Sequence, residues 1–228
     1  MGENVSVIIP AYNEQNRIQR TLDSLKGIDM INEIIVADDG STDMTYMELK
    51  DRRDIVLLHT DKNKGKGEAV KRAIRHVKNN NVVLLDADLC ETAAEAAKLI
   101  SYIEPDKRRI IIGRLPSPVK KGGFGIVKSI SDHGLYLLTG RHVLSLLSGQ
   151  RVLPLEFLRS FELPAGFGME FKITLEALRQ GYELLEVPVN MKHRESQRDI
   201  KGFVHRGRQC HDIVEVIIYE ICNKRLRS

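Results

Sequence analysis

Short apolar runs alternate with helical patterns through the first half of the chain, and this alternation limits the fold more than any other feature. The apolar runs predict strands at residues 5–9, 33–37, 55–58, 82–85 and 110–112. The patterns between them predict helices from a cap at Asn13 to about residue 25, from about residue 42, and over 66–77 and 93–103. Strict alternation indicates βαβ units on a parallel sheet, which binds ligands at the carboxyl ends of its strands.

The second half is less regular. The segment KKGGFG at residues 120–125 predicts a long loop after the fifth strand. Helical patterns follow at 126–147, 155–160 and 169–180, then a strand at 183–189 and a closing helix from about residue 207. We find no clear linker, so we expect one domain over 1–228. In it, 1–113 form a nucleotide-type crevice and 114–228 supply the acceptor and lid half.

Composition is that of an ordinary globular protein of 228 residues. No apolar run approaches the roughly 20 residues that span a bilayer, and the first ten residues do not resemble a signal peptide. Three cysteines in no metal-binding pattern predict a reducing compartment without disulfides or a zinc site. We therefore expect a cytoplasmic protein, with peripheral contact to the cytoplasmic face of a membrane left open.

Positive charge is concentrated in two segments, although the net charge is only +4. Residues 114–128 hold four cations and no acid, and residues 191–211 hold six Lys or Arg against two acids. A solvated surface would explain either segment. Both contain glycines or loop breakers instead of a regular helical face, which favours binding of an anionic partner.

Acidic clusters follow three of the predicted strands: Asn13 with Glu14, Asp38 with Asp39, and Asp86 with Asp88. Each cluster alone could be a turn or a helix cap. Their recurrence at one edge of the sheet points to a shared site. Two carboxylates at the end of a buried strand repel each other, and a divalent cation is a common way to offset them.

Glycine-rich phosphate loops are missing from this edge. The segment PAYNEQN after the first strand lacks the G-x-G-x-x-G pattern of a dinucleotide site, and no P-loop occurs. We therefore expect a nucleotide pocket in which a metal and cationic side chains hold the phosphates.

Four motifs resemble the nucleotide-sugar domain of the family 2 glycosyltransferases. They are VSVIIPAYNE, IIVADDGSTD, NKGKGEAVKRAI and VVLLDADL, in this order within the first 90 residues. The resemblance implies an α/β protein of the GT-A fold, with a Rossmann-like, mostly parallel sheet flanked by helices and an irregular acceptor-side second half. It also implies a nucleoside diphosphate sugar as donor and Mg²⁺ or Mn²⁺ as cofactor.

The same resemblance assigns roles to the residues of these motifs. Asp39 would contact the nucleobase or ribose, Asp86 with Ala87 would lie near the ribose or metal-bound waters, and Asp88 would ligate the metal on the diphosphate. The remaining positions would line the nucleotide: Pro10, Ala11, Tyr12, Glu14, Lys66 and Gly67.

Later segments resemble polyprenyl-phosphate hexose transferases and also glucosyl-3-phosphoglycerate synthase, a retaining enzyme. These segments are SGQRVL, GFGMEFKITLEAL and ELLEVPVNMKHRES. The resemblance implies that Glu170 lies in the sugar and acceptor site and that His193 completes the metal sphere. Glu170 could equally stabilise the N-terminus of its helix through the helix dipole, and His193 could have a purely structural role. An inverting transfer would use Glu170 as base, whereas a retaining one would use it to hold the sugar.

Cations outside the motifs are candidates for phosphate groups, because arginine matches phosphate oxygens in a bidentate way. Arg151 could hold either phosphate group. The cations considered for the diphosphate are Arg194, Arg198, Lys201, Arg206 and Arg208. Those considered for an anionic acceptor are Arg114, Lys120 and Lys121.

The expected activity is metal-dependent transfer of one hexose from a UDP- or GDP-sugar to a phosphorylated or lipid-phosphate acceptor. A processive synthase is disfavoured because the chain lacks Gln-x-x-Arg-Trp and has no tryptophan. Two alternatives are a retaining synthase-like enzyme and a non-catalytic module that binds nucleotide sugars. A pyrophosphorylase is disfavoured because the chain lacks its glycine-rich loop. Nucleic-acid binding is disfavoured because the chain has few aromatic residues to stack on bases. A homodimer is possible. The closing helix could pack on the core, on a second subunit or at a membrane.

Overall fold

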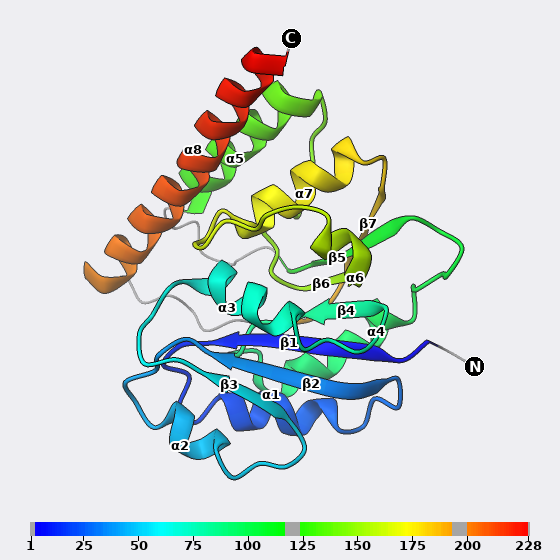
Figure 1. Ribbon diagram of the computed structural model, residues 1–228, viewed down its shortest axis with the longest axis vertical. Coiled ribbons are helices and arrows are strands. Elements are labelled where there is room, and N and C mark those ends of the chain that lie inside the picture. The colour runs from blue at the N-terminus through cyan, green and yellow to red at the C-terminus, as the bar shows by residue number, and fades with distance from the viewer. Residues whose placement is uncertain (1–2, 117–123, 193–199, 228) are drawn as a thin grey trace.

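The computed structural model describes residues 3–116, 124–192 and 200–227. Seven strands within these residues form one sheet with the order β3-β2-β1-β4-β6-β5-β7 (Figure 1). The strands are β1 (Val5–Ala11), β2 (Ile31–Asp38), β3 (Val56–His59), β4 (Asn81–Leu84), β5 (Arg109–Arg114), β6 (Arg151–Pro154) and β7 (Glu183–Pro188). All neighbouring pairs are parallel except those of β6, which runs antiparallel to β4 and β5. The mostly parallel α/β sheet expected from the sequence is confirmed.

Strand β6 is the element that the sequence analysis missed. Its four residues are too few to show a period, and they lie between two helical patterns. Because β6 is antiparallel to its neighbours, its first residues lie at the edge where β4 and β5 end. The residues just before β6 therefore join the edge where the acidic clusters lie.

Side chains alternate between two cores, as the pleat of a strand requires. Ile8 faces one core, whereas Val7 and Ile9 face the other. The helices that cover the first face are α3 (Lys66–Ile74), α6 (Leu155–Arg159) and α7 (Met169–Arg179). Those that cover the second are α1 (Ile18–Leu25), α2 (Thr45–Leu49), the 3₁₀ helix η1 (Cys90–Glu95) and α4 (Ala96–Ile100).

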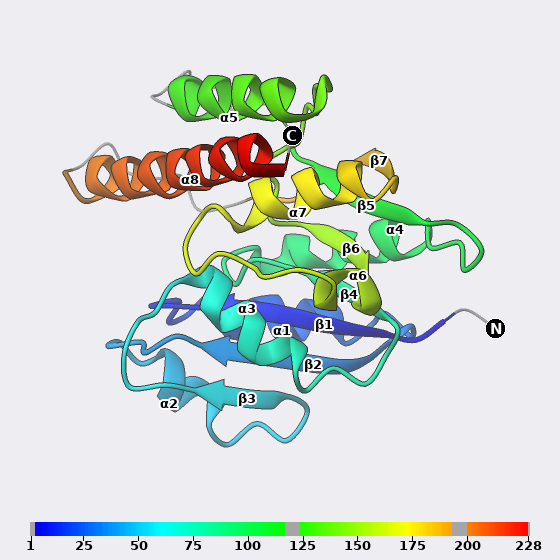
Figure 2. The same ribbon diagram turned by 45° about the horizontal axis from the view of Figure 1, so that its top comes forward.

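Two longer helices, α5 (Phe124–Thr139) and α8 (Ile200–Arg227), form a further layer outside α7. Figures 1 and 2 show them side by side and running in the same direction. Gly134 of α5 allows the close approach, because a Cβ built there would lie 2.4 Å from Ile217 Cδ1 of α8. Within the described residues, no helix combines the length and the apolar content that crossing a membrane requires.

The largest differences from the expected helix boundaries occur at three positions. Asn13 does not cap the first helix, because it has φ 58° and α1 begins only at Ile18. The helix expected over 126–147 ends at Thr139, where Gly140 adopts φ 71°. The closing helix begins at Ile200, seven residues before the glycine at which it was expected to start.

Candidate active site

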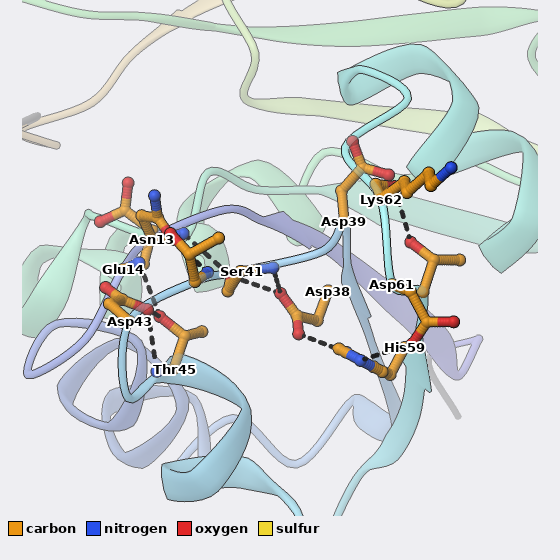
Figure 3. A network of polar contacts seen from close by, with 12 residues as sticks. Asn13, Glu14, Asp38, Asp39, Ser41, Asp43, Thr45, His59, Asp61 and Lys62 are labelled. Atoms are coloured by element: carbon orange, nitrogen blue, oxygen red, sulfur yellow. Dashed lines mark hydrogen bonds and ion pairs between the residues drawn. The ribbon is translucent and has the colours of Figure 1, made fainter.

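The loops after β1 and β2 are joined by a network of polar contacts around Asp38 (Figure 3). Asp38 is fully buried, and its Oδ1 accepts a hydrogen bond of 2.5 Å from Ser41 Oγ. His59 Nδ1 lies 2.7 Å from the other carboxylate oxygen. The Ser41 hydroxyl in turn accepts from the backbone N–H of Asn13 at 2.9 Å. Asp38 therefore braces the two loops and is not exposed to a ligand.

Residues of the first motif lie at the rim of this network. The backbone N–H of Glu14 donates to Thr45 Oγ1 at 2.8 Å, and the Glu14 carboxylate pairs with Arg17 at 2.6 Å. Tyr12 is 44% exposed, whereas Ala11 is buried and Pro10 is partly buried. Tyr12 is thus the residue of PAYNE whose side chain is available to a base or ribose.

Asp39 connects the end of β2 to the start of α3. Its Oδ2 accepts two backbone hydrogen bonds, from Lys64 N at 2.9 Å and Gly65 N at 2.7 Å. The other oxygen, Oδ1, is buried and has no hydrogen-bond partner among the described residues, and Arg72 Nη2 lies 3.6 Å from it. A buried carboxylate oxygen without a donor is costly, so this atom favours a ligand or water that donates to it.

Lys66 lies between two carboxylates from distant parts of the chain. Its Nζ is 2.6 Å from Asp86 Oδ1 and 2.7 Å from Glu170 Oε1. Burial lowers the pKa of Lys66, but the charges of Asp86 and Glu170 outweigh that effect, and the net pKa is raised. The ammonium group therefore stays charged across the physiological range and holds α3, β4 and α7 together at the sheet edge.

Gln150, which the sequence analysis did not select, contacts Asp86 twice. Its Nε2 donates to Asp86 Oδ2 at 2.6 Å, and its Oε1 accepts from Asp86 N at 3.1 Å. The preceding Gly149 leaves the necessary room, since a Cβ there would lie 2.7 Å from Asp86 Oδ2 and 2.9 Å from Lys66 Nζ. The SGQR segment thus reaches the site through its amide and not through its arginine.

Arg151 is fully enclosed by protein, and the structure does not bring it to the surface of the site. It donates to the carbonyl oxygens of Ser148 and Leu146 and to Thr174 Oγ1 of α7. Burial lowers the pKa of Arg151 to about 10. Consecutive strand residues point to opposite faces, which separates the surroundings of Gln150 and Arg151. A fully buried arginine with these acceptors fixes the residues that precede β6.

Asp88 lies two residues after Asp86, partly buried, in the turn after β4. No group of three or more His, Cys, Asp or Glu side chains able to hold a metal occurs among the described residues. Mg²⁺ commonly binds through one or two carboxylates together with substrate phosphates. One partly accessible carboxylate at the edge of the sheet therefore fits a cation that arrives with a diphosphate.

The structure describes only some of the cations that were predicted to bind phosphate groups. Arg114 is exposed at the end of β5, at the same edge as Asp86. Arg206 lies in α8, where the backbone alone is described, as do Lys201 and Arg208. The residues that fall outside the described ranges are His193, Lys120, Lys121, Arg194 and Arg198.

The turn that precedes Glu170 is held by contacts from two sides. Against α3, a Cβ built at Gly67 would lie 1.8 Å from the carbonyl oxygen of Pro164, and Glu68 N donates to Ala165 O at 3.1 Å. Against α8, Phe167 N donates to Asp212 Oδ2 at 2.9 Å. The position of Glu170 therefore depends on both helices.

The fold is the α/β architecture of the GT-A class, and the candidate site lies at the carboxyl edge of its mostly parallel sheet. A family model described as "Glycosyl transferase family 2" matches residues 6–153, and the chain belongs to this family. The resemblance found in the sequence is thereby confirmed.

Curated relatives include named transferases. Dolichol-phosphate mannosyltransferase of Pyrococcus furiosus is 30% identical over 81% of this chain and 55% of its own length. Dolichyl-phosphate beta-glucosyltransferase of Dictyostelium discoideum is 40% identical over 37% of this chain and 30% of its own. The chain thus spans about a third to just over half of these proteins. The family and these names support a transferase enzyme.

Solved structures of one enzyme share the fold over nearly the whole chain. Glucosyl-3-phosphoglycerate synthase from Mycobacterium tuberculosis, in complex with Mn²⁺, uridine diphosphate and phosphoglyceric acid, matches with a TM-score of 0.78 at 22% identity. The match covers 96% of this chain and 78% of that one. Another structure of that enzyme contains Mg²⁺ and uridine diphosphate.

Proposed function

We propose that this chain is a metal-dependent glycosyltransferase that moves a single hexose from a UDP- or GDP-sugar to a phosphorylated or lipid-phosphate acceptor. The convergence of Lys66, Asp86 and Glu170 at the carboxyl edge of the sheet, beside Asp88, is the observation that carries the proposal. Four charged groups from three distant segments are costly to gather at one place, and a structural role alone does not require them there.

The donor nucleotide lies, in this proposal, between the loops that follow β1 and β2. Tyr12 offers an exposed ring, and Asp39 offers a buried oxygen to which no described residue donates a hydrogen bond. A nucleobase or ribose presents both a flat face and hydrogen-bond donors, which fits this pair. Pro10, Ala11, Glu14 and Gly67 shape the same crevice.

The diphosphate lies toward Asp88, which holds Mg²⁺ or Mn²⁺, with His193 as a second candidate ligand. When bound, the cation supplies positive charge that stabilises the leaving diphosphate. Lys66 provides a further charge close by, while Asp86 and Gln150 keep it oriented. Because Lys66 neutralises Asp86, Asp88 and Glu170 only in part, the cation would offset the remaining negative charge as well as that of the leaving diphosphate.

The acceptor enters from the side of α7 and β5. Glu170 is the proposed base if the acceptor attacks through a hydroxyl, whereas a lipid phosphate would attack through an ionised oxygen and need no base. Arg114 at the end of β5 is the proposed contact for an acceptor phosphate, with Lys120, Lys121, Arg194, Arg198 and Arg206 as further candidates. The two curated relatives named for dolichol phosphate favour a lipid-linked acceptor.

Thermal unfolding with UDP, GDP, UDP-glucose and GDP-mannose, each with and without Mn²⁺, tests the proposal. A ligand at 100 times its dissociation constant adds about 2.7 kcal/mol to the folded state. We expect one base to stabilise the wild type only with metal, Asp88→Ala to abolish that shift, and Asp106→Ala, at an exposed turn, to retain it. If no nucleotide shifts the wild type in either condition, the proposed donor site is wrong. Nucleotide binding without turnover on any phosphate acceptor would favour a binding module.

A further inference from the structure

Asp86 meets a positive or positively polarised group at each of its two carboxylate oxygens. Lys66 Nζ lies 2.6 Å from Oδ1, and the side-chain amide of Gln150 donates to Oδ2 through Nε2, also at 2.6 Å. The same amide accepts from Asp86 N at 3.1 Å through Oε1. This orientation of the amide pairs a donor with an acceptor at both contacts. A cation that approaches either oxygen of Asp86 therefore meets the ammonium group or an amide N–H.

The backbone of Gln150 is held on both sides. Gly113 N of β5 donates to Gln150 O at 2.8 Å, and Gln150 N donates to Ser148 Oγ at 3.3 Å. The next residue, Arg151, is fully buried and donates to Ser148 O at 2.8 Å. Gln150 is also fully buried, so its amide has no solvent into which it could turn. The contact with Asp86 is thus fixed by the packing around β6.

The number of carboxylates around a divalent cation decides whether it needs a nucleotide to bind. In the proposed function the cation is held by Asp88, which lies two residues after Asp86. The affinity of a protein site for such an ion depends on the number and charge of its ligands. One carboxylate holds the ion weakly, and the oxygens of a bound diphosphate add the charge that is missing. Two neighbouring carboxylates would hold the ion much better without a nucleotide.

We propose that Gln150 keeps Asp86 out of the coordination sphere of the metal, so that the cation binds tightly only together with the nucleotide diphosphate. Gln150 acts through Asp86 and is a positioning residue. A cation held by both aspartates would also compete with Lys66 for Asp86, and Gln150 protects that ion pair. The cation then enters with the donor and leaves with the nucleoside diphosphate. This inference deepens the proposed function and rests on it for the metal and the nucleotide.

Electron paramagnetic resonance of free Mn²⁺ tests the inference, because it measures metal binding without turnover. Gln150→Met keeps the length of the side chain and removes both polar atoms, whereas Gln150→Glu adds a carboxylate beside Asp86. Gln180→Met is the matched control, since it removes an amide that donates to Ser160 Oγ outside the site. Each protein is titrated with Mn²⁺ alone and with Mn²⁺ in the presence of UDP or GDP, and its melting temperature shows that it is folded.

We expect wild type and control to bind Mn²⁺ at least about tenfold more tightly with one of the nucleotides than without it. Both Gln150 variants should bind Mn²⁺ alone at least about tenfold more tightly than wild type. Adding Asp86→Asn to Gln150→Met should reverse that gain.

Unchanged binding of Mn²⁺ alone in both Gln150 variants would overturn the inference, as would a gain in Gln150→Met that survives Asp86→Asn. A wild type that binds Mn²⁺ with neither nucleotide would refute the proposed function and this inference with it. Nucleotide-dependent binding in wild type together with unchanged Gln150 variants would refute this inference alone.

Discussion

Lys66 and Glu170 are 104 positions apart in the chain, yet Nζ of the first lies 2.7 Å from Oε1 of the second. The contact joins the first turn of α3, in the proposed nucleotide-sugar half, to the first turn of α7, in the proposed acceptor half. In the proposed function, donor binding and acceptor chemistry therefore share one ion pair, and several consequences of that sharing can be measured.

Removal of Lys66 should destabilise the protein through the carboxylates that it leaves behind. For Lys66→Met we expect a loss of about 3 kcal/mol in the free energy of unfolding, because a buried charge without its partner is costly. The double variant Lys66→Met, Glu170→Gln should recover about 1 kcal/mol or more of that loss. Urea denaturation measures both. Lys64→Met, at an exposed position two residues earlier, is the control. If the stability losses of the two single variants simply add in the double variant, the ion pair contributes nothing to the free energy of unfolding.

Substitution of Glu170 distinguishes a base from a positioning residue. If Glu170 accepts the proton of an acceptor hydroxyl, Glu170→Gln should lower kcat about 10²- to 10⁴-fold and leave donor affinity nearly unchanged. Steady-state kinetics with the identified donor, together with nucleotide titration, would show this. A loss of less than about tenfold, without a change in the pH profile, would contradict the role of base. It would indicate an acceptor whose attacking oxygen is already ionised, such as a phosphate.

Substitution of Arg151 should lower the stability of the protein, whereas substitution of Arg114 should weaken its use of the acceptor. Arg151→Lys removes a planar donor from three buried acceptors, so we expect about 2–3 kcal/mol less stability. Its nucleotide affinity should change little once the protein is folded. Arg114→Ala, at an exposed position, should leave stability within about 0.5 kcal/mol and weaken the use of a phosphorylated acceptor. Unfolding curves and acceptor KM values measure the two effects. Normal stability with weakened nucleotide binding in Arg151→Lys would restore its role as a phosphate ligand.

Gly67 tests the contact between α3 and the turn before α7. Any Cβ at this position would clash with the carbonyl oxygen of Pro164, which is backbone and cannot rotate away. We expect Gly67→Ala to cost about 1–3 kcal/mol and to displace Glu170 along with the turn. Gly27→Ala is the control, because nothing lies within 4 Å of a Cβ there. Thermal unfolding compares the two variants, and equal melting temperatures would show that the turn yields without cost.

The contribution of Glu220 to the stability of the protein should depend on pH. Burial raises the pKa of this carboxyl, but hydrogen bonds from Lys172 and Arg179 outweigh that effect and lower it. A lowered folded-state pKa stabilises the protein above the unfolded value, about 4.3, and the stabilisation is lost as the pH falls below it. Glu220→Gln should therefore be about 2 kcal/mol less stable than wild type at neutral pH, with the gap closing in acid. Glu215→Gln, exposed on the same helix, should show no such gap. A gap that persists in acid would mean that charge is not its cause.

Sequence reasoning reached the fold because apolar periodicity and motif order are local signals. The same reasoning placed Asp39, Lys66, Asp86 and Glu170 in the site, and the structure brings the last three into contact. It could not find β6 or Gln150. The four residues of β6 are too few to show the alternation of a strand. The pairing of Gln150 with Asp86 exists only because β6, from the second half of the chain, inserts beside β4. The buried state of Arg151 is likewise a property of packing around Thr174, which no neighbouring residue in the sequence reveals.

The central position of β6 also bears on how the chain reaches its native state. β4 and β5 pair not with each other but with β6, which is contributed only after residue 150. Until β6 arrives, an apolar strand edge on each of them is bare, and such edges attract other chains. Contacts this far apart in sequence also slow folding. During synthesis, β4 and β5 therefore cannot complete their pairing until residues 151–154 have been made, and a chaperone that shields β4 would have its greatest effect in that interval.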